Sequence, residues 1–279
     1  MSHLAAAKPD VLIHLRRADA PTRAGNVGLA LAQRLGGWVT GLCVVPIAPV
    51  AFASPEAVAL YVNEADELYR EALQCAPAWR AQLDAYGIEG ELQVAQGDTI
   101  EALCHVSRWS DLVVVERPQR VPDAPVGWGT VSRTVFGVSA PVVVVPETAP
   151  CVTVGTHIIV AWNQSRESML AIRGALPLLL RAERVSVLDG DPGESPFGLR
   201  YLPKLDLRAW LQRRGVAAQF QRFNVDKDRG AALLAAAHVA GADLIVMGAW
   251  GHSRIAELVL GGATRHLFQH SDLPLLVAH

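Results

Sequence analysis

The sequence predicts an α/β fold made of two domains, each an open five-stranded parallel sheet with helices on both faces. Three observations support this prediction. Runs of Val, Ile and Leu alternate with helical patterns along the chain, which is typical of buried parallel strands joined by crossover helices. The same order of segments occurs twice. A length of 279 residues suits about two domains.

The repeat is visible when the chain is laid on itself with an offset of 132 residues. This offset aligns SDLVVVERP (110–118) with ADLIVMGAW (242–250), and GTVSRTVF (129–136) with GGATRHLF (261–268). Each copy then ends in a short apolar run that follows a proline, as expected for a last strand. The two halves are therefore predicted to have the same architecture.

The first half, assigned to residues 1–148, contains five predicted strands and one long helix. The strands are the runs VLIHL, WVTGLCVV, GELQVAQ, DLVVVE and VVVVP. The long helix should occupy much of residues 54–87, with a bend at Pro77, because proline removes a helical hydrogen bond. This half therefore supplies a complete doubly wound unit.

The second half, assigned to residues 155–279, repeats this order. Its strands are the runs HIIVAW, RVSVLD, AQFQRF, DLIVMG and LPLLVA. One helix is expected to begin at Ser165, with Glu167 close behind, and another to run from Asp228 to Gly241. In such a sheet, a ligand binds at the carboxyl ends of the strands near the point where the strand order reverses.

Composition excludes several classes of protein. The chain is 51% hydrophobic and 19% charged, with a formal net charge of −2 and no basic stripe, so we expect no nucleic-acid partner. The N-terminus shows no secretory signal, and we expect a cytoplasmic protein. The most apolar window, residues 231–250, contains His238 and Asp243 and divides into a helix and a strand, so we expect no membrane span.

Four glycines surround the segment after the strand DLIVMG. Gly248 ends the strand, where a missing side chain would let a ligand approach the backbone. Gly251 can take a positive φ, and Gly261 with Gly262 opens a helix whose N–H groups and dipole attract an anion. Thr264 could cap that helix or contact a phosphate oxygen. The glycines predict a phosphate site, and the alternative is a turn and helix entry without a ligand.

This pattern of Gly, two residues, Gly, nine residues and Gly resembles the nucleotide loop of the universal stress protein family. The resemblance covers both halves, so the chain looks like a tandem member. It implies Rossmann-like or flavodoxin-like domains, with ATP bound by this loop in one subclass. It also implies that family domains pair through their last strands. We therefore expect VVVVP and LLVAH to meet in an intrachain pseudo-dimer, and a homodimer remains open.

The resemblance carries the family's ligand residues onto two regions of the second half. Around the loop they are Met247, Gly248, Gly251, Gly261, Gly262, Ala263 and Thr264. Near the adenine they are Ala161, Trp162, Asn163 and Val187. Trp162 could stack on the base or simply pack in the core.

Several positions depart from the family pattern. Gly262 stands where the family usually has Ser or Thr, which removes one hydroxyl near the phosphates. Asn163 replaces an acidic residue and can still hydrogen-bond a base or ribose without charge. The first half keeps only Gly129 and Thr130 of the pattern, and Glu116 would repel a phosphate. We expect this half to be a degenerate copy without a site.

We therefore predict a stress-response sensor or regulator that binds one adenine nucleotide, ATP or AMP, in its second domain, with or without magnesium. A protein partner that reads its state is unidentified. Because the chain has no Walker loop, dinucleotide fingerprint or nucleophile elbow, we expect slow ATP hydrolysis at most, and we assign no catalytic residue or metal ligand. Two alternatives stay open: a ligand-free interaction scaffold, and a slow ATPase in which Asp189 or Asp191 holds magnesium.

Overall fold

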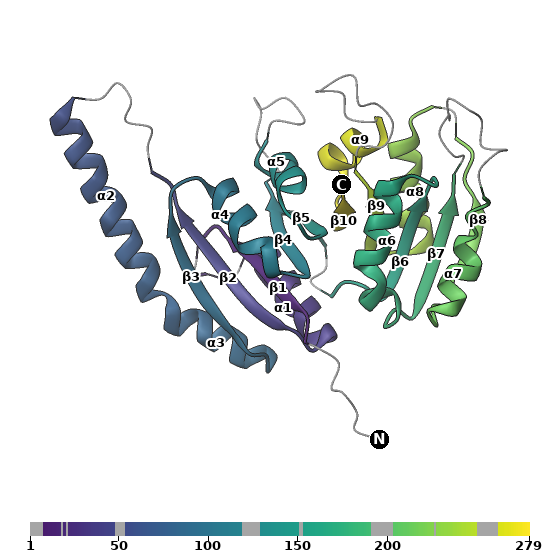
Figure 1. Cartoon of the computed structure of the whole chain (residues 1–279), viewed down its shortest axis with the longest axis horizontal. Coiled ribbons are helices and arrows are strands. Elements are labelled where there is room, and N and C mark those ends of the chain that lie inside the picture. Colours follow the sequence, from purple (N-terminus) through teal and green to yellow (C-terminus); the bar gives the residue numbers. More distant parts are fainter. Residues whose placement is uncertain are drawn as a thin grey trace.

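The computed structural model describes residues 8–17, 19–20, 22–47, 54–118, 129–150, 153–190, 203–225, 227–249 and 262–279. Ten strands of this part of the chain form one sheet in the order β3-β2-β1-β4-β5-β10-β9-β6-β7-β8. Helices cover both faces of the sheet (Figure 1). The predicted α/β fold class is confirmed.

The first half contributes β1 to β5, which are all parallel to one another. The strands are β1 (Asp10–Leu15), β2 (Trp38–Val45), β3 (Gly90–Gln96), β4 (Leu112–Arg117) and β5 (Val142–Pro146). The helices are α1 (Arg23–Leu35), α2 (Pro55–Gln74), α3 (Ala76–Tyr86), α4 (Thr99–Val106) and α5 (Thr130–Gly137), with a short 3-10 helix, η1 (Ser107–Trp109).

The second half repeats this topology with a shorter connection before its third strand. The strands are β6 (His157–Trp162), β7 (Arg184–Asp189), β8 (Gln219–Arg222), β9 (Leu244–Gly248) and β10 (Leu275–Ala278). The helices are α6 (Arg166–Leu179), α7 (Leu207–Arg213), α8 (Arg229–Ala240) and α9 (Gly262–His270). The strand order reverses between β6 and β9, which is where this type of sheet places a ligand.

The two halves join through their last strands. Strand β5 pairs with β10, and this is the antiparallel pair of the sheet, with Val142 opposite Val277 and Val144 opposite Leu275. A pair of identical strands related by a two-fold axis must run antiparallel. The predicted intrachain pseudo-dimer is confirmed.

The long predicted helix is broken in two. Helix α2 ends at Gln74 and α3 begins at Ala76, with Cys75 between them. Pro77 lies in the first turn of α3, where its missing N–H leaves no helical hydrogen bond unmade. The predicted bend is therefore present and takes the form of a helix break.

Two apolar cores lie on the two faces of the sheet. One contains residues of α1, α3, α6 and α7. The other contains residues of α4, α5, α8 and α9. The central strands are buried on both faces, as in Val142–Val145, which accounts for their continuous apolar runs. Within the described residues, no helix combines the length and apolar character needed to cross a bilayer.

Candidate functional site

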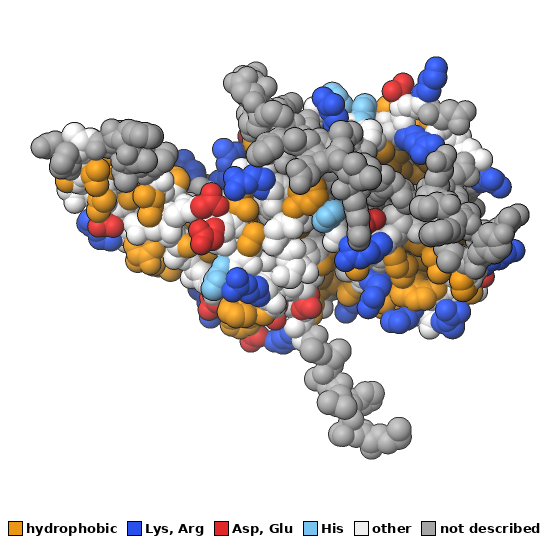
Figure 2. Space-filling view, turned by 45° about the horizontal axis from the view of Figure 1, so that its top comes forward, with side chains coloured by type: hydrophobic (Ala, Val, Ile, Leu, Met, Phe, Trp, Pro, Cys, Tyr) orange, Lys and Arg blue, Asp and Glu red, His pale blue; other side chains and the backbone are white. Residues whose placement is uncertain are grey.

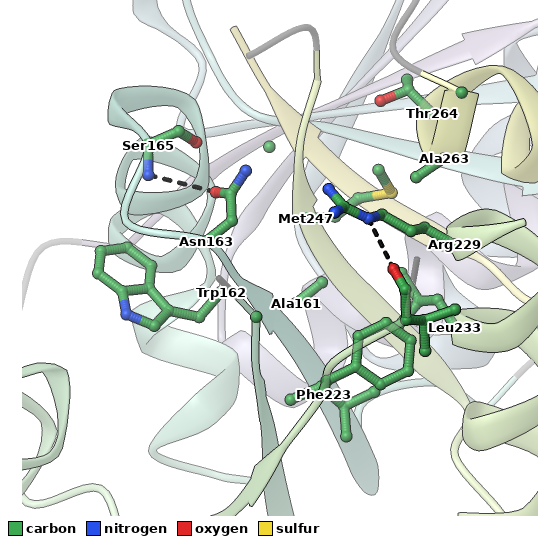
Figure 3. A pocket seen from close by; sticks show the side chains of 15 residues that line it. Ala161, Trp162, Asn163, Ser165, Phe223, Arg229, Leu233, Met247, Ala263 and Thr264 are labelled. Carbon is green, nitrogen blue, oxygen red and sulfur yellow. Dashed lines mark hydrogen bonds between the residues drawn. The ribbon is translucent and has the colours of Figure 1, made fainter. Parts of the chain in front are cut away.

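A cavity of about 340 Å³ opens at the carboxyl ends of β6, β7 and β9 and at the N-termini of α8 and α9 (Figure 3). Its volume lies in the lower part of the range of small-molecule sites. The described residues that line it are Ala161, Trp162, Asn163, Ser165, Leu188, Gly190, Phe223, Val225, Arg229, Leu233, Met247, Gly248, Gly262, Ala263 and Thr264. The cavity lies at the predicted place, beside the point where the strand order reverses.

The structure brings together eight of the eleven residues assigned to the site from the sequence. They are Ala161, Trp162, Asn163, Met247, Gly248, Gly262, Ala263 and Thr264. Gly251 and Gly261 lie outside the described residues, so their predicted roles keep the status of predictions. Asp191, the alternative magnesium ligand, also lies outside them.

The eleventh residue, Val187, does not line the cavity. Successive side chains of a strand point to opposite faces of the sheet, and Val187 is fully buried in the core that contains α6 and α7. The next residue, Leu188, lies on the other face and lines the cavity. Because side chains alternate along β7, the residue of this strand that lines the cavity is Leu188 and not the predicted Val187.

Trp162 also belongs to the core on the face of α6 and α7, and it is 5% exposed. Figure 3 shows its indole turned away from the middle of the cavity, which favours the packing role over stacking on a base. Phe223 supplies an aromatic ring at the cavity wall instead. The signal for Phe223 was available in the sequence, since this residue ends the predicted strand AQFQRF.

Asn163 follows β6 and directs its amide nitrogen toward the cavity (Figure 3). Its Oδ1 atom accepts a hydrogen bond from the backbone N–H of Ser165 at 3.2 Å. Ser165 in turn caps α6, because its Oγ atom accepts from the backbone N–H of Ser168 at 3.1 Å. With its oxygen used in this turn, Asn163 offers the cavity a hydrogen-bond donor, which a carboxylate could not.

Gly248 is required by packing rather than by ligand approach. A Cβ atom at this position would lie 2.4 Å from the backbone nitrogen of Ser168 and 2.7 Å from the carbonyl carbon of Glu167. The absence of a side chain thus lets the N-terminus of α6 pack on the end of β9. Gly262 differs, since a Cβ atom there would meet no described residue within 4 Å.

The cavity is bounded on a further side by the close contact of α8 and α9. A Cβ atom at Gly230 would lie 2.5 Å from Cβ of His266 and 2.9 Å from the carbonyl oxygen of Ala263. This contact holds Arg229, the first residue of α8, at the cavity beside the first turn of α9. Thr264 of that turn is 5% exposed and directs its hydroxyl toward the cavity (Figure 3).

Arg229 is the one charged residue in the described lining, and no sequence pattern pointed to it. Its Nε atom donates to the carbonyl oxygen of Val225 at 2.9 Å, which orients the guanidinium toward the cavity (Figure 3). Among the described residues other than glycine, positive φ occurs at Gln164 (62°) and Asp228 (51°). Both adjoin cavity residues, and such backbone strain clusters at functional sites.

The electrostatics of the described lining favour an anion. Arg229 and the amide of Asn163 are donors, and the N-termini of α8 and α9 add backbone N–H groups and the positive ends of two helix dipoles. No carboxylate occurs among the described lining residues. Nor does the described part of the chain contain a cluster of three acidic, His or Cys side chains arranged for a metal ion.

The corresponding strand ends of the first half carry larger, ionisable side chains. Both first strands pair with their fourth strands in the same register, and on this alignment Ala161, Asn163 and Gly248 correspond to His14, Arg16 and Glu116. Glu116 has a side chain only 6% exposed, with Oε1 3.5 Å from Nη1 of Arg16. Its Oε2 atom accepts from the backbone N–H of Ala24, in the first turn of α1, at 3.3 Å.

Fold and cavity together define a doubly wound α/β protein of the Rossmann-like class, with an anion-friendly cavity in its second half. Residues 156–279 match the model of the universal stress protein family. The second half of this chain is therefore a universal stress protein domain, and the resemblance noted in the sequence is confirmed for it.

Solved structures extend the likeness in fold to the whole chain. A universal stress protein from Archaeoglobus fulgidus DSM 4304 is 15% identical, with 96% of this chain and 97% of that chain covered and a TM-score of 0.70. A functionally unknown protein from Pseudomonas aeruginosa PAO1 is 13% identical, with 98% and 92% covered and a TM-score of 0.53. At these identities the likeness shows the fold alone. No curated protein matches the chain.

Proposed function

We propose that the second half binds one adenine nucleotide in this cavity and that the protein acts as a cytoplasmic sensor or regulator in a stress response. The observation that carries the proposal is the lining itself, in which the donors of Arg229, Asn163 and two helix N-termini face a cavity without a described carboxylate. The phosphates lie at the N-terminus of α9, where N–H groups and the helix dipole bind anions.

The remaining wall suits a flat base. Leu188, Phe223, Leu233 and Met247 form an apolar surface on the same side of the sheet as α8 and α9. Ligand sites of this kind combine apolar walls with a few polar groups that fix orientation. Arg229 adds a charge-assisted hydrogen bond to a phosphate oxygen, which is about twice as strong as a neutral one.

Titration calorimetry of the full chain with ATP, ADP, AMP and adenosine tests the proposal, each with and without magnesium. We expect one site per chain and an affinity that rises with the number of phosphates, since the donors favour negative charge. GTP serves as the control for the base. If no adenine nucleotide binds at millimolar concentration, the nucleotide function is wrong and the scaffold alternative takes its place. Release of phosphate from ATP over hours would identify the slow ATPase.

The scaffold alternative has an observation of its own in α2. This helix exposes Leu60, Tyr61, Val62, Leu68 and Leu73, with Leu60 66% exposed, and Figure 2 shows hydrophobic side chains along the projecting arm that α2 forms. Exposed apolar patches of this sort mark interaction surfaces. Light scattering on the wild type and on the double variant Leu60→Glu/Leu68→Glu tests self-association, which should be weaker in the variant if α2 mediates it.

A further inference from the structure

Arg117, the last residue of β4, reaches from the first half into the second. Its Nη1 atom donates to the carbonyl oxygens of Leu267 and Phe268 at 3.1 and 2.7 Å. Its Nη2 atom donates to the carbonyl oxygen of Ser271 at 2.5 Å. One guanidinium thus serves three carbonyl groups at the C-terminus of α9, whose other end lines the cavity.

These contacts have the chemistry of a helix anchor. The last carbonyl groups of a helix have no partner within it and carry the negative end of the dipole. A guanidinium offers several donors in one plane and remains charged in proteins. Burial lowers the pKa of Arg117, the carboxylate of Asp272 acts in the opposite direction, and the side chain is half-buried between the two halves.

The anchor exists on one side of the pseudo-two-fold axis only. With the offset of 132 residues, the counterpart of Arg117 is Ala249, which is fully buried and has no side chain that could reach α5. Helix α5, the counterpart of α9, instead brings Phe136 edge-on against His279, with 4.6 Å between ring centroids. The charged anchor therefore belongs to α9, the helix beside the cavity, and not to its counterpart α5.

Helix α9 is held near both ends by different neighbours. Gly230 of α8 packs against Ala263 and His266 on the cavity side, and Arg117 holds the far end. The helix has nine residues, so a tilt allowed at its C-terminus displaces the N–H groups at its N-terminus. Affinity for an anion depends on where those groups lie.

We propose that Arg117 is a positioning residue through which the first half of the chain fixes the anion-binding end of α9. The first half thereby contributes to nucleotide affinity in the second half. This inference rests on the proposed nucleotide function of the cavity, and it assigns a role to a residue that does not touch the ligand.

Calorimetry with ATP on three variants tests the proposal. Arg117→Gln removes the charge and three of the five N–H donors, Arg117→Lys keeps the charge, and Arg34→Gln is the matched control. Arg34 also joins the halves, because its Nη2 atom donates to the carbonyl oxygen of Arg181, but Arg181 follows the C-terminus of α6, away from the cavity. We expect Arg117→Gln to weaken ATP binding about tenfold, Arg117→Lys to recover part of the loss, and Arg34→Gln to bind like the wild type.

Equal affinities for Arg117→Gln and the wild type, or an equal loss in Arg34→Gln, would overturn the proposal. Hydrogen exchange on the ligand-free proteins separates its failure from that of the nucleotide function. The amides of residues 266–270 should exchange faster in Arg117→Gln than in Arg34→Gln. If the wild type binds no nucleotide, this difference alone decides whether Arg117 holds α9, and no difference refutes it. Should Arg117→Gln fail to fold, the same comparison is made with Arg117→Lys.

Discussion

The two halves of this chain share one topology but differ in the residues at the carboxyl ends of their first and fourth strands. In the second half, the small residues Ala161 and Gly248 line a cavity beside the point where the strand order reverses. In the first half, His14 and Glu116 stand at the corresponding positions. The Glu116 carboxylate accepts from the N-terminal turn of α1, the counterpart of α6, on the face of the sheet opposite to α4 and α5. Buried apolar strands therefore preserve the fold, whereas a few residues at the strand ends determine whether a site exists.

The largest effect is expected when Gly248 of the second half is replaced by Glu, the residue at the corresponding position of the first half. Gly248→Glu sets a side chain against the backbone of Ser168 and Glu167, where even a Cβ atom would lie 2.4 Å from a backbone nitrogen, and adds a negative charge near the phosphates. We expect ATP affinity to fall at least about a hundredfold and unfolding free energy to fall by about 1–3 kcal/mol.

Calorimetry and chemical denaturation measure these two effects. Gly262→Ala is the control, since its added Cβ atom meets none of the residues that the structure describes within 4 Å, and it should alter neither quantity appreciably. Retained affinity in Gly248→Glu would show that the end of β9 takes no part in binding.

Buried His14, the counterpart of Ala161, should also make the first half sensitive to acid. Burial, and then the charge of Arg16, lowers the pKa of His14 to about 4 from 6.5. Between these values the unfolded chain binds a proton that the folded chain does not, so stability falls as the pH drops from about 6.5 to about 4. The loss reaches about 3 kcal/mol at pH 4. Denaturation of the wild type and of His14→Gln across this range measures it, and parallel stability profiles would contradict it.

Arg229 gives the described lining of the second-half cavity its positive charge. Its replacement by Gln removes the positive charge that faces the cavity (Figure 3), and we expect ATP to bind about tenfold to thirtyfold more weakly. Adenosine, which has no phosphate, should bind the variant and the wild type alike. Arg213→Gln, an exposed position on α7, is the matched control for net charge. An equal loss for ATP and adenosine would assign Arg229 to general packing.

The smallest expected change brings the second half closer to the family pattern. Gly262→Ser places a hydroxyl at the N-terminus of α9, where the Cβ position has no neighbour within 4 Å in the described part of the chain. One additional neutral hydrogen bond should raise ATP affinity about threefold to tenfold. Gly262→Ala lacks the hydroxyl and should give no gain. If both variants bind ATP equally, the hydroxyl does not contact the phosphates.

Local patterns were sufficient to predict the fold. The predicted limits of β2, β3, β5, β6 and β7 agree with the structure, because runs of buried apolar residues between turn signals determine where such strands begin and end. The pairing of β5 with β10 was also predicted, from the repeat together with the family resemblance.

Only part of the site was predicted from the sequence, because the remaining residues reach it through three-dimensional contacts. Val187 and Leu188 differ only in which face of β7 they occupy, and the sequence does not reveal which face carries the cavity. Arg229 reaches it because Gly230 lets α8 approach α9. Arg117 contacts residues 150 or more positions away, and no local pattern reports such a contact.

The antiparallel pairing of β5 with β10 has a consequence for how this molecule could diverge. Two separate copies of one domain, paired through the same strands, would carry every substitution at two places and would separate on dilution. Here a single polypeptide joins the two partners, so their association does not depend on protein concentration. Each partner can also change alone. Glu116 can stand in one half where the other has Gly248, and Arg117 can contact the neighbouring half without receiving the same contact in return.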